Sequence, residues 1–233
     1  MRIAFFGGTF DPPHLGHTAI AEAALERCEL DEVLMAPVAS QPLKQGATTA
    51  SFADRLAMVR LACEGHPRLQ ASGLDAPRKN DADSAPNYTP NYTYDTLLRL
   101  RAKLAPADEL FCLLGADSFR MVQRWHRGPE LLLLCDMIIA GRPGFPITEL
   151  GTYLPSSFVC QGPHVTARRI EWVLRDLRSG DASRLWLLPD LEYDISATAV
   201  RAALDCGASD QAQPVLAPAV ARYACEHHLY QQG

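Results

Sequence analysis

The sequence lacks several features that would point to particular classes of protein. No run approaches the ~20 apolar residues of a membrane-spanning helix, because the longest candidate, residues 131–140, is interrupted by Asp136. Lys and Arg number 22 against 27 Asp and Glu, and the resulting net charge of -5 gives no overall attraction for nucleic acid or anionic lipid. We therefore expect a protein that binds neither nucleic acid nor a membrane, although this charge still permits a local cationic pocket.

The seven cysteines form no framework. They are odd in number and widely spaced, and none belongs to a C-x-x-C pair, so neither a disulfide scaffold nor a zinc cluster is predicted. The apolar segment at residues 3–6 is too short for a secretory signal. These features predict a cytoplasmic protein whose thiols are reduced and serve mainly as small core residues.

Short apolar runs alternate with helical patterns along the chain. Because the runs are too apolar to have a solvent-facing side, they predict an α/β fold with a doubly wound, Rossmann-like open parallel sheet. A helix after Ser51 opens with a Ser-x-x-Asp capping pattern. The other expected helices are 18–28, 94–104 and 168–178, and the expected strands are 3–6, 33–36, 69–71, 110–114, 137–140 and 185–188.

Two segments depart from this alternation. Residues 75–91 are dominated by Pro, Asn, Asp and Ser and include the first copy of a tandem PNYT repeat, which predicts an exposed loop. From Ile195 onward the sequence predicts two or three short helices. We expect one domain over residues 1–233, consisting of an α/β core at 1–194 and a small C-terminal helical annex at 195–233.

The candidate functional residues are densest at 7–17, between the first expected strand and the first expected helix. The sequence of this segment is G-G-T-F-D-P-P-H-L-G-H. Gly7 and Gly8 let backbone N–H groups approach an anion, and a helix start attracts negative charge. His14 and His17 can point at one bound group, unless their roles are structural. The segment predicts a phosphate site, and it matches neither the P-loop nor the G-x-G-x-x-G pattern.

The segment at 7–17 resembles the H-x-G-H signature of the nucleotidyltransferase superfamily, in the form found in bacterial nicotinate-nucleotide adenylyltransferases. Residues 195–201, I-S-A-T-A-V-R, are similar to the second signature of that superfamily, I-S-S-T-x-x-R. Four further segments fall in the family's order between these two, at 91–97, 114–117, 125–126 and 142–144. Residues 1–233 are thus expected to form a single nucleotidyltransferase domain.

This resemblance implies transfer of the adenylyl group of ATP to nicotinic acid mononucleotide, which gives nicotinic acid adenine dinucleotide and pyrophosphate in NAD biosynthesis. Mg²⁺ would be bound through the ATP phosphates, without a dedicated set of protein ligands. His14 and His17 would be catalytic, as donors to charge on the α-phosphate. The implied ATP-binding residues are Gly7, Gly8, Thr9, Phe10, His14, His17, Ser196, Thr198 and Arg201.

The residues of the second signature could bind phosphate for reasons that do not depend on the resemblance. Ser196 or Thr198 can cap a helix, and Arg201 lies one turn further on, so charge-assisted hydrogen bonds could hold the β- and γ-phosphates. The alternative is an ordinary capped surface helix. Ala197 stands where the family usually has a second serine, which affects the expected phosphate affinity rather than the type of reaction.

The resemblance also implies a set of residues for the mononucleotide, some of which have structural alternatives. Lys44 is similar to a family lysine that reaches a substrate phosphate, or it is a solvated surface lysine. Asp117 can accept a hydrogen bond from a ribose hydroxyl or cap a helix, and Trp125 can stack on a pyridine ring or fill the core. The full set is Lys44, Thr93, Asp117, Trp125, His126 and Arg142.

Two other functions are compatible with the same motifs. One is a different adenylyl or cytidylyl transfer, as in pantetheine-phosphate adenylyltransferases or cytidylyltransferases, and residues 92–97 with Trp125 favour the pyridine nucleotide over these. The other is a nucleotide-binding sensor without turnover, which the intact His14, His17 and Arg201 disfavour. The sequence leaves the oligomeric state open between a monomer and a small homo-oligomer.

Overall fold

A computed structural model describes residues 1–39, 48–77, 91–141, 147–191, 195–205 and 215–231. The chain divides into two compact units. Unit 1 consists of residues 1–6, 20–33 and 92–192, and unit 2 of residues 7–19, 34–91 and 193–233. Most of the loop predicted at 75–91 lies outside the described residues.

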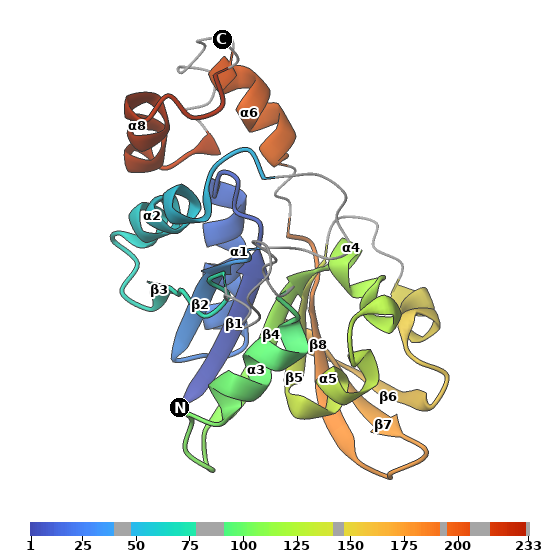
Figure 1. Ribbon diagram of the computed structural model, residues 1–233. Helices are drawn as coiled ribbons and strands as arrows, with labels where there is room; N and C mark the ends of the chain where they lie inside the picture. Colours follow the sequence, from blue (N-terminus) through green and yellow to red (C-terminus); the bar gives the residue numbers. More distant parts are fainter. Residues whose placement is uncertain (40–47, 78–90, 142–146, 192–194, 206–214, 232–233) are drawn as a thin grey trace. The chain divides into compact units, whose positions relative to one another are not determined.

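The helices and strands alternate in the first two thirds of the described chain (Figure 1). In chain order they are β1 (Arg2–Gly8), α1 (Leu15–Arg27), β2 (Glu32–Pro37), α2 (Phe52–Cys63), β3 (Leu69–Ala71), α3 (Thr93–Arg101), β4 (Glu109–Gly115), α4 (Ala116–Phe119), η1 (Val122–Arg124), α5 (Gly128–Leu134), β5 (Asp136–Ala140), η2 (Ile147–Tyr153), β6 (Phe158–Val165), β7 (Ile170–Asp176), β8 (Ala182–Leu188), α6 (Ala197–Asp205) and α8 (Pro218–Glu226).

The strands are hydrogen-bonded in the order β3-β2-β1-β4-β5-β8-β7-β6. Strand β4 pairs in parallel with β1 and β5, and β5 pairs in parallel with β8. Strand β7 runs antiparallel to both of its neighbours, β8 and β6. The sheet is therefore open and mostly parallel, which confirms the predicted fold class.

In unit 1, the central strands are buried on both sides. Phe111, Ile138 and Leu187 on adjacent strands are each at most 1% exposed. Helix α5 packs against β5 and β8 and also contacts α3 (Figure 1). Burial without a two-residue period is what continuous apolar runs predict for parallel strands under helices.

The prediction of a helix at 168–178 is wrong, because strand β7 occupies most of this segment. Burial alternates along it: Trp172 and Leu174 are buried, whereas Val173 and Arg175 are exposed. It pairs with β6 along one edge and with β8 along the other. Strand β6 was not predicted, because most of its residues are exposed and give no apolar run.

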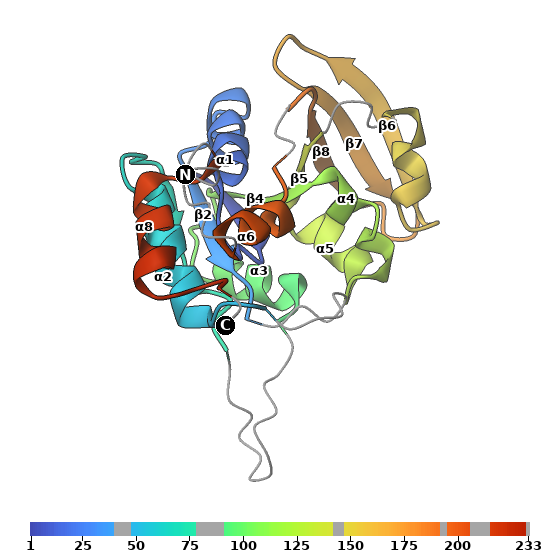
Figure 2. The ribbon, with the colours of Figure 1, turned by 90° about the horizontal axis from the view of Figure 1, so that it is seen from above.

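In unit 2, the predicted cap of α2 is present, since the Ser51 hydroxyl accepts from the Asp54 N–H at 3.1 Å. The predicted C-terminal helices are present as α6 and α8. Helix α8 lies beside α2 in both views (Figures 1 and 2), and apolar side chains from α2, α6 and α8 form one buried cluster. No described helix has the length and apolar character needed to cross a membrane.

The strand assignment of β7 leads to a stability prediction. Leu174→Ala should lower the free energy of unfolding by about 2–5 kcal/mol, because a fully buried leucine leaves a cavity. Leu177→Ala is the matched control, since Leu177 is 63% exposed, and should change it by less than about 0.5 kcal/mol. Urea denaturation measures both, and equal effects would contradict the strand register.

Candidate nucleotide site

The segment that follows β1 is tightly packed. The Val38 N–H, just after β2, donates to the Gly8 carbonyl at 2.9 Å. A Cβ atom at Gly8 would lie 3.0 Å from the Phe10 ring, so the missing side chain makes room for that ring. Phe10 is buried and has a φ of 48°, a left-handed conformation that is uncommon for a bulky residue. Such strain persists where the surroundings fix the backbone.

His14 and His17 lie together at the start of α1. Their rings are stacked with centroids 3.7 Å apart, and the Phe10 ring packs edge-on against His17 with centroids 4.9 Å apart. The backbone N–H of His14 donates to Nδ1 of His17 at 3.2 Å. Because Nδ1 accepts, the neutral His17 ring carries its proton on Nε2. The structure thus brings the two predicted catalytic histidines together.

Asp11 is a buried carboxylate between Phe10 and the histidines, 4% exposed. Its side chain accepts three hydrogen bonds. They come from the N–H groups of Thr49 and Ala50, at 2.7 and 3.1 Å, and from the Tyr230 hydroxyl at 2.8 Å. A buried carboxylate needs such donors, because an unpaired charge away from water is very costly.

Arg55 on α2 is 1% exposed and holds three segments through their carbonyls. Its Nη1 donates to the Thr9 and Val38 carbonyls at 2.7 and 2.8 Å, and its Nε donates to the Ala50 carbonyl at 3.3 Å. Burial lowers the pKa of this guanidinium, while Asp11 acts in the opposite direction. Arginine stays charged in proteins, so Arg55 is a fixed cation beneath the segment at 7–17.

The second signature contacts the first within unit 2. Arg201 on α6 donates through Nη1 to the Asp11 carbonyl at 2.7 Å and through Nη2 to the Thr198 hydroxyl at 3.1 Å. The Val200 N–H donates to the Ser196 carbonyl, so Ser196 occupies the cap position and Thr198 lies inside the helix. Neither α1 nor α6 has an acidic residue in its first turn, which leaves both N-termini attractive to anions.

The described residues expected for the mononucleotide lie in unit 1. Thr93 is the first residue of α3, directly after Tyr92, whose ring stacks on His126 at 4.2 Å. Trp125 precedes His126 and is half-buried. Thr93, Trp125 and His126 are therefore grouped by the contact between Tyr92 and His126.

Asp117 is not a helix cap. Gly115 occupies the cap position of α4, and Asp117 is inside the helix with a 64% exposed side chain that lies 4.0 Å from Arg120. Lys44 and Arg142 lie outside the described residues.

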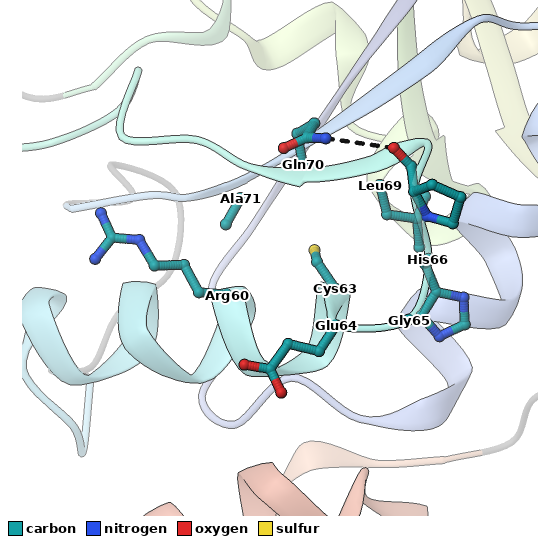
Figure 3. Close-up of a pocket in the computed structure, with 9 residues that line it drawn as sticks. Arg60, Cys63, Glu64, Gly65, His66, Leu69, Gln70 and Ala71 are labelled. Atoms are coloured by element: carbon teal, nitrogen blue, oxygen red, sulfur yellow. Dashed lines mark hydrogen bonds between the residues drawn. The ribbon is translucent and has the colours of Figure 1, made fainter.

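A shallow pocket of about 540 Å³ lies in unit 2 between the end of α2 and β3 (Figure 3). Its lining includes Arg60, Cys63 and Gln70, and no predicted site residue. Burial raises the pKa of the Cys63 thiol to about 11, so this thiol is protonated at neutral pH. Within the described parts of the chain, no cluster of three or more His, Cys, Asp or Glu could hold a metal ion.

Sequence reasoning missed three residues of this site. Asp11 lies inside the recognised motif but received no role, because its three hydrogen-bond donors come from distant segments. Arg55 belongs to an amphipathic helix whose polar residues would ordinarily face solvent. Tyr230 is 219 residues from Asp11, and nothing local in the sequence indicates that contact.

An open, mostly parallel sheet, with paired histidines at the first helix start, defines an α/β protein suited to nucleotides. A family model described as cytidylyltransferase-like matches residues 5–203, and the chain belongs to that family.

Relatives that match over the full length of the chain have names that specify one activity within this family. A protein of Solibacter usitatus, named probable nicotinate-nucleotide adenylyltransferase, is 36% identical, and the match covers 99% of this chain and 100% of the relative. A protein of the same name from Citrifermentans bemidjiense is 35% identical, with 99% and 98% covered. The resemblance predicted from the sequence is confirmed.

A solved structure shares the fold. Plasmodium falciparum nicotinic acid mononucleotide adenylyltransferase complexed with APC matches with a TM-score of 0.66, over 98% of this chain and 96% of that chain. The sequence identity is 17%, so this likeness concerns the fold alone.

Arg55 should be essential for stability. Arg55→Met should lower the free energy of unfolding by roughly 3 kcal/mol, because it leaves buried carbonyls without a donor. Arg60→Met changes an exposed arginine of the same helix and should have an effect below about 0.5 kcal/mol. Chemical denaturation monitored by circular dichroism compares them, and a stable Arg55→Met protein would refute the anchoring role.

Proposed function

We infer that this chain is a nicotinate-nucleotide adenylyltransferase, which transfers the adenylyl group of ATP to nicotinic acid mononucleotide and releases pyrophosphate. The observation that supports this most is the meeting of the two signatures, because Arg201 donates to the backbone of the segment that carries His14 and His17. Full-length relatives with that name support the particular substrates. Their coverage of the whole chain also supports a single nucleotidyltransferase domain.

On the ATP side, we assign the phosphates to unit 2. The start of α1 presents backbone N–H groups beside His14 and His17, and the start of α6 presents them beside Arg201. The histidines serve the α-phosphate, and Ser196, Thr198 and Arg201 serve the β- and γ-phosphates. Gly7, Gly8, Thr9 and Phe10 shape the floor of the site, with Gly8 and Phe10 packed on each other.

The reaction needs orientation and charge neutralisation more than a nucleophilic side chain. A 5′-phosphate oxygen of the mononucleotide attacks the α-phosphorus of ATP, the new P–O bond forms, and the bond to the pyrophosphate oxygen breaks. Since the phosphate is already ionised, no general base is required. His17, with its proton on Nε2, donates to the charge that develops on the α-phosphate.

Mg²⁺ would bind together with ATP, without a dedicated site on the protein. Mg²⁺ would be held mainly through the phosphates of ATP, with few ligands from the protein, and would supply positive charge that offsets the charge of the phosphates. The chain's own contribution is positive charge and N–H donors, from Arg201, the histidines and the two helix starts.

On the mononucleotide side, we assign Thr93 and the backbone around Trp125 and His126 to the pyridine carboxylate, with the Trp125 ring against the pyridine. The grouping of Thr93 and His126 around Tyr92 supports this assignment. Asp117, exposed at the carboxyl end of β4, is available to a ribose hydroxyl. Lys44 remains in the proposal as a residue that reaches a substrate phosphate, and Arg142 remains in it as a mononucleotide-binding residue.

His17→Ala should lower kcat by about 10²–10³, because a preorganised donor to transition-state charge contributes about 2.7–4 kcal/mol. His164→Ala provides a control, since His164 is exposed on β6, and should retain wild-type kcat. Steady-state pyrophosphate release measures both. Retention of more than half of the wild-type kcat by His17→Ala would end its catalytic assignment.

Substrate choice tests the function itself. A site of hydrogen-bond donors accepts the nicotinate carboxylate but meets the NH₂ group of nicotinamide with another donor. We expect kcat/KM to favour nicotinic acid mononucleotide over the amide by at least ~10²-fold, equivalent to roughly 2.7 kcal/mol. Pyrophosphate release with ATP in excess measures kcat/KM for each of the two mononucleotides. Absence of turnover would reject the proposed function, and equal values would reject the carboxylate-recognition model.

A further inference from the structure

Tyr230 lies far along the chain from the catalytic segment but contacts it directly. Its hydroxyl donates to Asp11 Oδ1 at 2.8 Å, and both residues are buried, at 7% and 4% exposed. Burial and the neighbouring Asp11 carboxylate raise the pKa of the Tyr230 hydroxyl well above its usual range, so Tyr230 is a hydrogen-bond donor throughout the physiological pH range.

We propose that Tyr230 is a positioning residue for adenylyl transfer, which acts by fixing Asp11 and thereby the segment that carries His14 and His17. This inference rests on the proposed function. It assigns to the C-terminal segment a part in catalysis that is separate from phosphate binding by Arg201.

The surroundings of Tyr230 hold its hydroxyl in place. Its ring belongs to the apolar cluster formed by α2, α6 and α8. The residue has a φ of 67°, a conformation that a tyrosine rarely adopts and that packing must maintain. The hydroxyl is therefore presented to Asp11 by a rigid frame.

Asp11 transmits this constraint to the histidines. Its carboxylate is fixed by Tyr230 and by two backbone N–H groups, and its carbonyl is fixed by Arg201. His14 follows three residues later and is stacked on His17 at 3.7 Å. Loss of one donor leaves a buried acceptor unpaired, so the segment can relax and the histidines can move relative to the start of α1.

Displacement of the histidines should affect the transition state more than the bound substrates. Interactions that strengthen only as charge develops on the α-phosphate appear in kcat, whereas ground-state binding appears in KM. Tyr230→Phe removes only the hydroxyl oxygen. We expect a kcat about tenfold below wild type, with the KM for ATP within about twofold.

Tyr223→Phe is the matched control. Tyr223, on α8, also donates from its hydroxyl to a carboxylate of unit 2, that of Asp54, at 3.0 Å. Asp54 lies in the first turn of α2, outside the segment at 7–17. This variant therefore loses the same kind of bond from the same C-terminal part and should keep its kcat within about 1.5-fold of wild type.

Amide hydrogen exchange of residues 9–17 provides a readout that does not depend on turnover. Exchange should be faster than wild type in Tyr230→Phe and unchanged in Tyr223→Phe. With an active wild type the proposal requires both the exchange change and the kcat change, and either one alone overturns it. If the wild type forms no dinucleotide, the proposed function fails and the exchange comparison alone decides the positioning role.

A second variant covers the case in which Tyr230→Phe does not fold. Asp11→Asn keeps the size of the side chain, but its NH₂ group must face at least one of the three donors that surround Asp11. It should reproduce the loss of kcat at a nearly constant KM for ATP. Wild-type kcat in Asp11→Asn would overturn the proposal.

Discussion

The carboxylate of Asp11 is a buried charge that the fold must satisfy, and the arrangement of unit 2 follows from this requirement. An unpaired carboxylate in the interior would cost many kcal/mol, whereas three hydrogen-bond donors make it tolerable. These donors belong to the segment before α2 and to the C-terminal segment. The segment at 7–17 therefore depends on both of these segments for its stability, which couples the positions of the two histidines to the packing of α2, α6 and α8.

Arg55 shows how positive charge near the proposed phosphate site can stabilise the fold instead of binding substrate. A buried arginine beside a glycine-rich segment would ordinarily be a candidate phosphate ligand. Here its guanidinium already donates to the carbonyls of Thr9, Val38 and Ala50. Arg201 also donates to a carbonyl, that of Asp11, but its side chain is only partly buried and contacts Thr198 at the start of α6, where a helix terminus also attracts anions.

The sequence predicts the central strands and the two signatures because both depend on local information. Short apolar runs such as residues 110–114, bounded by polar or glycine residues, are typical of a strand buried on both faces, and His14 with His17 is a short-range pattern. Strand β7 resembles a helix in sequence because its apolar residues at 170, 173, 174 and 177 have helical spacing, whereas the observed burial alternates with a period of two. The hydrogen bond from Tyr230 to Asp11 is a tertiary contact across 219 residues, and no local pattern encodes it.

The contacts around Ala197 indicate how much this residue should affect the expected phosphate affinity. Arg201 is oriented by the Asp11 carbonyl and the Thr198 hydroxyl, and neither contact involves the side chain at 197. The backbone N–H groups at the start of α6 are also unaffected by the identity of that side chain. What alanine removes is one hydrogen bond from a hydroxyl to a charged phosphate, of about 1.5–3 kcal/mol, out of several that Arg201, the two remaining hydroxyls and the N–H groups at the start of α6 could make. Most of these donors are retained, so the proposed phosphate binding depends on the contact between the two signatures more than on the second serine.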